Sequence, residues 1–282
     1  MEAAIFIPDG DRFIPTDLAR SPWGPHVLHG GPPAGLLARA IEQTNPDPAL
    51  HVARMTVDLF RPVPKAPLHV TTQFVREGRR IAVIEASLLA DDIEVSRATA
   101  LLLRESEVDL PEAHLPAPPS LPGPEGIPTT GLSTMLTEGS PVAATMPGIS
   151  GFHTTIEVRR IAGGLATAGH GTAWIRIPVP FVAGEETTPL VRMAATADFG
   201  NALGHIRAGD GIGFINADIT LYLHRMPLGE WICLDSQSAG EPHGVGLVES
   251  MVHDERGPVG RVVQALLANR RFAPTNLENA ES

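Results

Sequence analysis

The chain is poor in cysteine and aromatic residues and has no long apolar segment. Its single cysteine, Cys233, excludes an internal disulfide and fits a reducing compartment. The segment around it, EWICLD, shows no activating pattern, so we expect an inert core thiol. No apolar run approaches the roughly 20 residues of a membrane helix. The start, MEAAIFIPDG, also lacks the features of a signal peptide. We therefore expect a cytoplasmic protein without a membrane span.

Positive charge is also scarce. Lysine and arginine number 21 against 32 aspartate and glutamate residues, which gives a formal net charge of −11. Nucleic-acid binding requires a basic face, so this class of function is excluded, although a few arginines can still meet an anionic ligand. The 282 residues, 43% of them hydrophobic, suffice for one large domain or two of ordinary size.

Proline gathers in one part of the chain, in LPEAHLPAPPSLPGPEGIP. Such a segment forms neither a helix nor a regular strand, because proline lacks a backbone N–H and fixes φ. We interpret residues 107–149 as a proline-rich linker. It would connect an N-terminal domain of residues 1–106 to a C-terminal domain of residues 150–282.

The two predicted domains repeat one order of elements: strand-like segments, one helix, then four strands. The helices are predicted at Pro32–Gln43 and in TTPLVRMAATADFGNALGHI, and β-branched residues between Gly, Pro and Asp mark the strands. A shift of 164 residues lays SRATALLL over GRVVQALL and Arg61 over Arg225. The repeat predicts an α+β fold, a tandem or double hotdog in which two antiparallel sheets each wrap around a central helix.

Several motifs resemble one family. They are HGG at 29–31, ATADFGNALG at 195–204, NADITLYLHRMPLGEW at 216–231 and GRVVQALLANR at 260–270. In order and spacing the chain resembles the double-hotdog acyl-CoA thioesterases of type II. The resemblance implies hydrolysis of an acyl-CoA substrate to a free acid and CoA, with no metal, no cofactor and no covalent intermediate.

The resemblance also implies a set of catalytic residues. The family holds the attacking water with a helix Asp, a strand Thr and a late Gln. Asp198 matches the first and Gln264 the last, whereas Asn216 occupies the threonine position. Asn can donate and accept hydrogen bonds, so it can still orient water. A second departure is Ile219, where the family often has His.

The chemistry of thioester hydrolysis assigns further roles. Asp198 can act as general base. Backbone N–H groups at a helix N-terminus can stabilise the oxyanion, and Gly30 and Gly31 would let a thioester reach that backbone. Asn201 shares a helix face with Asp198, and strand alternation places two further residues on the face of Asn216. The substrate-binding candidates are Gly30, Gly31, Asn201, Asp218 and Thr220. The arginines that could meet CoA phosphates are Arg61, Arg79, Arg80 and Arg225.

The repeat suggests one site per chain. The first helix has the glycine pair but Ala38 at the acid position, and the second has Asp198 but no glycine pair. We therefore expect each half to supply what the other lacks. Two alternatives stay open: a non-catalytic acyl-thioester binding module, and a hotdog enoyl-thioester hydratase or dehydratase. The latter needs a close Asp–His pair, which Asp198 and His205, seven residues apart, match poorly. Association into homo-oligomers and the acyl chain length are left open.

Overall fold

The computed structural model describes residues 3–116, 119–130, 150–164, 167–206 and 213–269. The first half begins with two short hairpins. Gly10, with φ of 62°, turns the first hairpin. The elements are β1 (Phe6–Asp9), β2 (Arg12–Pro15), η1 (Asp17–Ala19), β3 (Arg20–Ser21), β4 (Gly24–Leu28), α1 (Gly31–Thr44), β5 (Leu50–Asp58), β6 (Leu68–Arg76), β7 (Ile81–Ala90) and β8 (Ile93–Arg104).

The second half repeats the helix and the four long strands. Its predicted helix is interrupted at Asp198, whose N–H donates to Thr196 O. The elements are α3 (Phe152–Thr155), β9 (Glu157–Gly164), β10 (Thr167–Arg176), α4 (Pro189–Ala197), α5 (Phe199–Leu203), β11 (Gly213–Asn216), β12 (Asp218–Leu223), β13 (Ile232–Gly240), β14 (Val245–Asp254) and β15 (Gly257–Asn269). Between the halves lies η2 (Glu112–His114).

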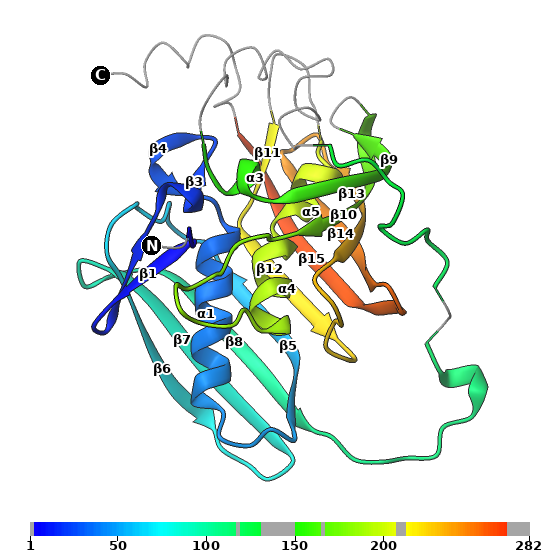
Figure 1. Ribbon diagram of the computed structural model, residues 1–282, viewed down its shortest axis with the longest axis horizontal. Coiled ribbons are helices and arrows are strands. Elements are labelled where there is room, and N and C mark those ends of the chain that lie inside the picture. The colour runs from blue at the N-terminus through cyan, green and yellow to red at the C-terminus, as the bar shows by residue number, and fades with distance from the viewer. Residues whose placement is uncertain (1–2, 117–118, 131–149, 165–166, 207–212, 270–282) are drawn as a thin grey trace.

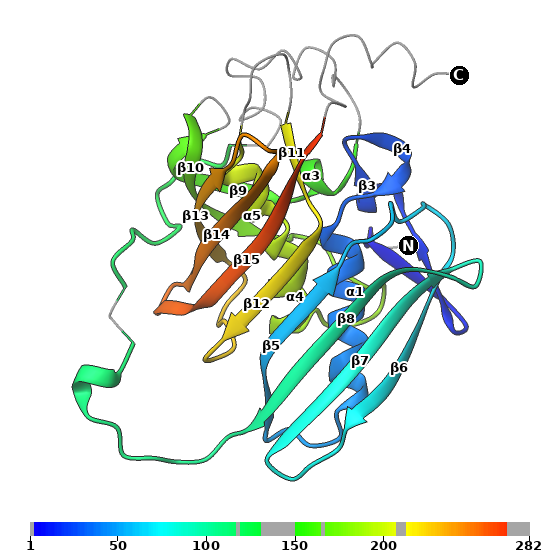
Figure 2. The ribbon, with the colours of Figure 1, turned by 180° about the vertical axis from the view of Figure 1, so that it is seen from behind.

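The long strands form one antiparallel sheet. Among the described residues this sheet has 13 strands in the order β1-β2-β6-β7-β8-β5-β12-β15-β14-β13-β10-β9, with β11 beside β15. The two predicted antiparallel sheets are joined edge to edge into one, because β5 of the first half pairs with β12 of the second, with Thr56 opposite Thr220. Figure 2 shows these two strands side by side at the centre.

The internal repeat is confirmed by the strands. Adding 164 to the bounds of β6 and β7 gives the bounds of β13 and β14, and the same shift brings the start of β8 onto the start of β15. Alternation within the strands is equally regular. Ala82, Ile84, Ala86 and Leu88 of β7 are buried, while the residues between them are partly exposed. β7 therefore has one buried face and one face that is partly exposed.

The two central helices lie together against one face of the sheet (Figure 1). They are antiparallel, because Gly31 at the start of α1 meets Ala195 near the end of α4, while Glu42 near the end of α1 bonds to Thr188 at the start of α4. Their approach is close: a Cβ on Gly31 of α1 would lie 2.3 Å from the backbone oxygen of Ala195 on α4. The core therefore runs without a break from one half into the other.

The described part of the proline-rich segment packs against the second half. Trp174 Nε1 donates to Pro122 O at 2.9 Å, and Arg159 donates to Pro124 O at 2.6 Å. Thr130 N–H bonds to Val158 O on β9. Residues 131–149 of the predicted linker lie outside the described residues. None of the described helices is long and apolar enough to cross a membrane.

Candidate active site at the helix junction

The start of α1 and the α4–α5 junction meet at Asp198. An added Cβ on Gly30 would lie 2.8 Å from both carboxylate oxygens of Asp198, and one on Gly31 would lie 2.3 Å from Ala195 O. The space beside both glycines is thus occupied by the protein itself. We expected these glycines to admit a ligand, but the structure gives them another reason: they let an acid of the second half approach the helix of the first.

The carboxylate of Asp198 is buried, with 8% of the residue exposed, and it is surrounded by donors. His29 Nδ1 lies 2.7 Å from Oδ2, and Asn216 Nδ2 donates to Oδ1 at 2.8 Å. The Gly31 N–H lies 3.3 Å from His29 Nδ1 and also interacts with this carboxylate. His29 and Gly31 come from the first half, and Asp198 and Asn216 from the second, so the cluster lies between the halves.

These contacts set the protonation state of Asp198. Burial raises the pKa of Asp198, because a charge is poorly solvated in the interior. The charge and hydrogen bond of His29 lower that pKa, as do the bonds from Asn216 and Gly31. The lowering effects prevail, so the pKa of Asp198 lies below its ordinary value of 3.8. The group is therefore an ionised acceptor at neutral pH and a weak proton acceptor.

Asn216 reaches Asp198 because of a β-bulge. Asn216 on β11 lies opposite Leu266, whereas Thr220 on β12 lies opposite Val263, so this chain has one residue more than β15 between the two pairs. The extra residue at Ala217 reverses the alternation. Asn216 therefore shares the inner face of buried Leu266, while Thr220 shares the outer face of Val263.

The expectation that Asp218 and Thr220 share a face with Asn216 is therefore wrong. Asp218 accepts from Ala265 N–H at 2.6 Å and from Thr220 Oγ1 at 3.2 Å. Thr220 also contacts Thr56 of β5 at 3.3 Å. These two side chains hold the central strands together on the face away from the helices, and the structure does not bring them to Asp198.

Gln264 lies beneath the junction on β15. It is fully buried, and its Nε2 donates to Ala197 O at 3.3 Å. Its Oε1 has no hydrogen-bond partner in the described structure and would lie 3.3 Å from a Cβ on Gly200. Gln264 therefore lies close to Ala197 and Gly200, which stand before and after Asp198 in the chain, without a hydrogen bond to Asp198 in the described structure. An orphaned buried acceptor of this kind is a natural position for a bound water.

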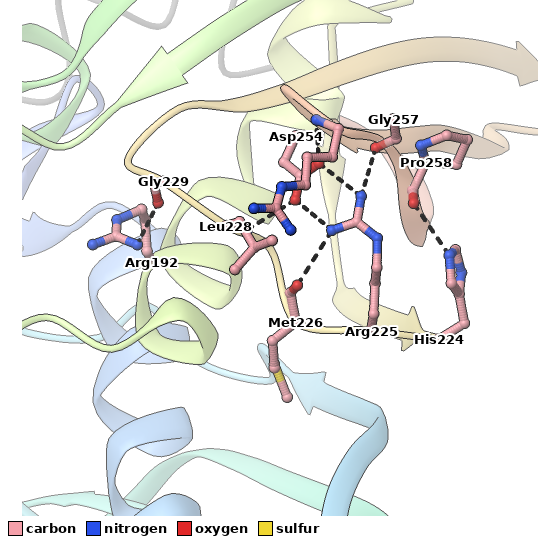
Figure 3. A network of polar contacts seen from close by, with 10 residues as sticks. Arg192, His224, Arg225, Met226, Leu228, Gly229, Asp254, Gly257 and Pro258 are labelled. Carbon is pink, nitrogen blue, oxygen red and sulfur yellow. Dashed lines mark hydrogen bonds and ion pairs between the residues drawn. The ribbon is translucent and has the colours of Figure 1, made fainter. Parts of the chain in front are cut away.

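Asn201 and Arg225 have structural contacts. Asn201 Nδ2 donates to Phe214 O at 3.1 Å and so fastens α5 to β11. Arg225 makes a two-pronged ion pair with Asp254 and also donates to Gly257 O, as Figure 3 shows. Because Asp254 is buried, this ion pair holds the Arg225 side chain at the β14–β15 turn. The other three CoA-binding candidates are exposed: Arg61, Arg79 and Arg80.

His29 is the residue that the sequence reasoning missed. Its side chain is 12% exposed and contacts the Phe152 and Phe199 rings, with centroid distances of 5.5 and 4.8 Å. Nearby His153 is buried, and burial followed by the charge of His29 lowers its pKa to about 4. The HGG motif contained the only signal, since His29 directly precedes the helix whose start we expected to form the site.

The helix start offers few backbone donors. The second and third residues of α1 are Pro32 and Pro33, which have no N–H, and Ala34 N–H bonds to Gly30 O. The Gly31 N–H faces His29 Nδ1 and Asp198. Within the described structure, the Gly30 N–H is the donor at this end that bonds to no other group. An oxyanion at this helix end would therefore meet one backbone donor.

Solved structures resemble this one over nearly its whole length. A protein from Novosphingobium aromaticivorans with a thioesterase assignment is 21% identical, with a TM-score of 0.67, covering 93% of this chain and 98% of its own. The tesB protein of Mycobacterium avium subspecies paratuberculosis is 16% identical, with a TM-score of 0.63 and coverages of 94% and 95%. A hot dog fold protein from Alicyclobacillus acidocaldarius is 17% identical, with a TM-score of 0.65 and the same coverages. The chain thus has a hotdog-type fold.

Family models define the chain more closely. A model of the acyl-CoA thioesterase N-terminal domain matches residues 19–103, and one of the C-terminal domain matches residues 124–268. The chain belongs to the acyl-CoA thioesterase family and is a thioesterase. None of the curated proteins compared with it matches.

Proposed function

We propose that the protein hydrolyses acyl-CoA thioesters with a water held by Asp198, Asn216 and Gln264. The observation that carries the proposal is the junction itself. A buried, ionised acid of one half lies against the helix start of the other, beside an amide oxygen without a partner. A carboxylate has about four lone-pair positions. The three donors on Asp198 leave one position for a water.

The remaining groups of the junction match the needs of a thioester. Gln264 Oε1 supplies a second acceptor for the water. The Gly30 N–H at the positive end of the α1 dipole would stabilise the oxygen that becomes negative as the water attacks. Each half of the chain would thus be one hotdog unit, with α1 and α4 as the two central helices, and the pair would hold one site. A cytoplasmic location is supported by the free, buried Cys233.

The test measures release of free thiol from a panel of acyl-CoAs of increasing chain length. We expect wild-type protein to release CoA and Asp198→Asn to lose most of that activity. Asp109→Asn, at an exposed acid outside the junction, is the matched control and should behave as wild type. Absence of release from every substrate would refute the proposal. Release that survives Asp198→Asn would refute the site but keep the activity.

A second candidate gains support from one contact. Hydration or dehydration of an enoyl thioester needs an acid and an imidazole close together, and His29 and Asp198 provide this pair in place of His205. The discriminating substrate is a 2-enoyl-CoA, with absorbance of the conjugated thioester and free thiol recorded in parallel. Loss of absorbance without thiol release would identify a hydratase, whereas thiol release before any hydration supports hydrolysis.

A further inference from the structure

We propose that His29 is a catalytic residue, whose Nε2 takes a proton from the attacking water and returns it to the CoA sulfur. This inference rests on the proposed hydrolytic function and deepens it. The residue that takes the proton, His29, belongs to the first half of the chain. The carboxylate that orients its imidazole, Asp198, belongs to the second half.

The contact with Asp198 fixes the orientation of the imidazole. Nδ1 lies 2.7 Å from Asp198 Oδ2 and 3.3 Å from the Gly31 nitrogen. Because the carboxylate is ionised and can only accept, we assign the hydrogen to Nδ1, which donates it to Oδ2 over the shorter contact. In the neutral ring the other nitrogen then has the free lone pair. In the described structure His29 Nε2 bonds to no other group, and the side chain retains 12% exposure. The lone pair is therefore available to accept one hydrogen of the attacking water, which leaves the other hydrogen for Asp198 or Gln264 Oε1.

Asp198 is poorly suited to take the proton itself. Three donors converge on it, and each stabilises the carboxylate over the carboxylic acid. The same carboxylate holds the ring through Nδ1 while Nε2 takes up the proton. The other groups around the ring carry no charge that competes with Asp198. His153 is buried, and its lowered pKa keeps it uncharged near neutral pH, while Phe152 and Phe199 contribute apolar rings.

The bonds and protons balance as follows. The water oxygen bonds to the thioester carbon while one water proton moves to His29 Nε2, and the carbonyl π electrons pass to oxygen. The carbonyl then re-forms, the carbon–sulfur bond breaks, and the proton on Nε2 moves to the departing sulfur. One thioester and one water become one carboxylic acid and one thiol, and His29 returns to its neutral form. No metal or redox partner enters the balance.

The experiment uses two variants of the full-length protein. His29→Gln keeps an amide donor for Asp198 but lacks an imidazole, and we expect kcat to fall about 10²–10⁴-fold, the usual range for loss of a general base. We expect KM to change less than threefold. His29→Ala removes the ring, and added imidazole should restore a measurable part of kcat. His26→Ala, at an exposed histidine three residues earlier, is the control and should keep wild-type activity.

The outcomes separate this inference from the proposed function. If wild type releases no thiol, the hydrolytic function fails. If wild type is active and folded His29→Gln keeps kcat within tenfold, only the role of His29 fails. The role of His29 would also be overturned if folded His29→Ala lost kcat and added imidazole did not restore it. That result is the one expected of a histidine with a purely structural role. Circular dichroism establishes that each variant is folded.

Discussion

Replacing Gly30 by alanine tests the junction with a single methyl group. The new Cβ would lie 2.8 Å from both carboxylate oxygens of Asp198 and 2.9 Å from its carboxyl carbon. Ordinary van der Waals contact begins at 3.4 Å, so the carboxylate must retreat by about 0.6 Å. Its bonds to His29 and Asn216, at 2.7 and 2.8 Å, would lengthen toward the limit of a hydrogen bond.

We expect a larger effect on catalysis than on stability. Misplacing a catalytic group by such a distance lowers the rate by up to about 10²-fold. Weakened bonds to a buried charge destabilise by about 1.5–3 kcal/mol. Alanine also lowers the conformational entropy of the unfolded chain, which offsets about 0.4–1 kcal/mol of this loss. The net loss is therefore about 1–2 kcal/mol, which leaves a folded protein.

The assay combines thiol release with urea unfolding. Gly123→Ala is the control, since a Cβ there would meet nothing within 4 Å. A folded Gly30→Ala protein with wild-type kcat would refute the reasoning, because it would mean that the position of Asp198 does not matter for catalysis.

Three further predictions test other parts of the structure. Asn216→Asp would put a second carboxylate beside Asp198, and we expect kcat to fall about 10²-fold or more. Because two neighbouring carboxylates must share a proton, the loss of stability in urea should be larger at pH 8 than at pH 5. Equal losses at both pH values would contradict this. His153 has a pKa of about 4 in the folded protein against 6.5 when unfolded, so its contribution is complete above pH 6.5 and falls by about 3 kcal/mol as the pH drops to 4. His153→Phe should remove that part of the pH dependence of urea unfolding, and His26→Gln should not. Burial raises the pKa of Cys233 far above its ordinary value, so a thiol reagent should label the chain only after unfolding, and rapid labelling of native protein would show that the thiol is accessible.

The sequence predicts the strands well because their signal is local. Alternating side chains and a repeat at constant spacing identify β6, β7, β13 and β14, and the apolar stripe of α1 marks the first helix. The join between β5 and β12 is not local. Both strands have the sequence pattern of ordinary half-buried strands. That pattern does not indicate which strand of the other half lies beside each of them.

Two features of the site escape the pattern for definite reasons. Strand alternation places Asn216 with Asp218, but the bulge at Ala217 turns Asn216 inward, and no Gly or Pro marks that position. His29 and Asp198 are separated by 169 positions, so their contact exists only once the two helices pack antiparallel. The sequence singled out the glycines of the HGG motif as a place where a thioester reaches the backbone, yet the group beside Gly30 is a carboxylate of the same chain.

The antiparallel helix pair has two ends, and they carry different residues. At one end Asp198 meets His29 and Gly30, and at the other Glu42 meets Thr188. In a symmetric dimer of single repeats, any substitution appears at both ends at once. Here each end is encoded separately, so selection can refine the acid–imidazole end while the opposite end adapts to packing alone. After duplication, the contacts at the Glu42 end can therefore change without changing the residues at the Asp198 end.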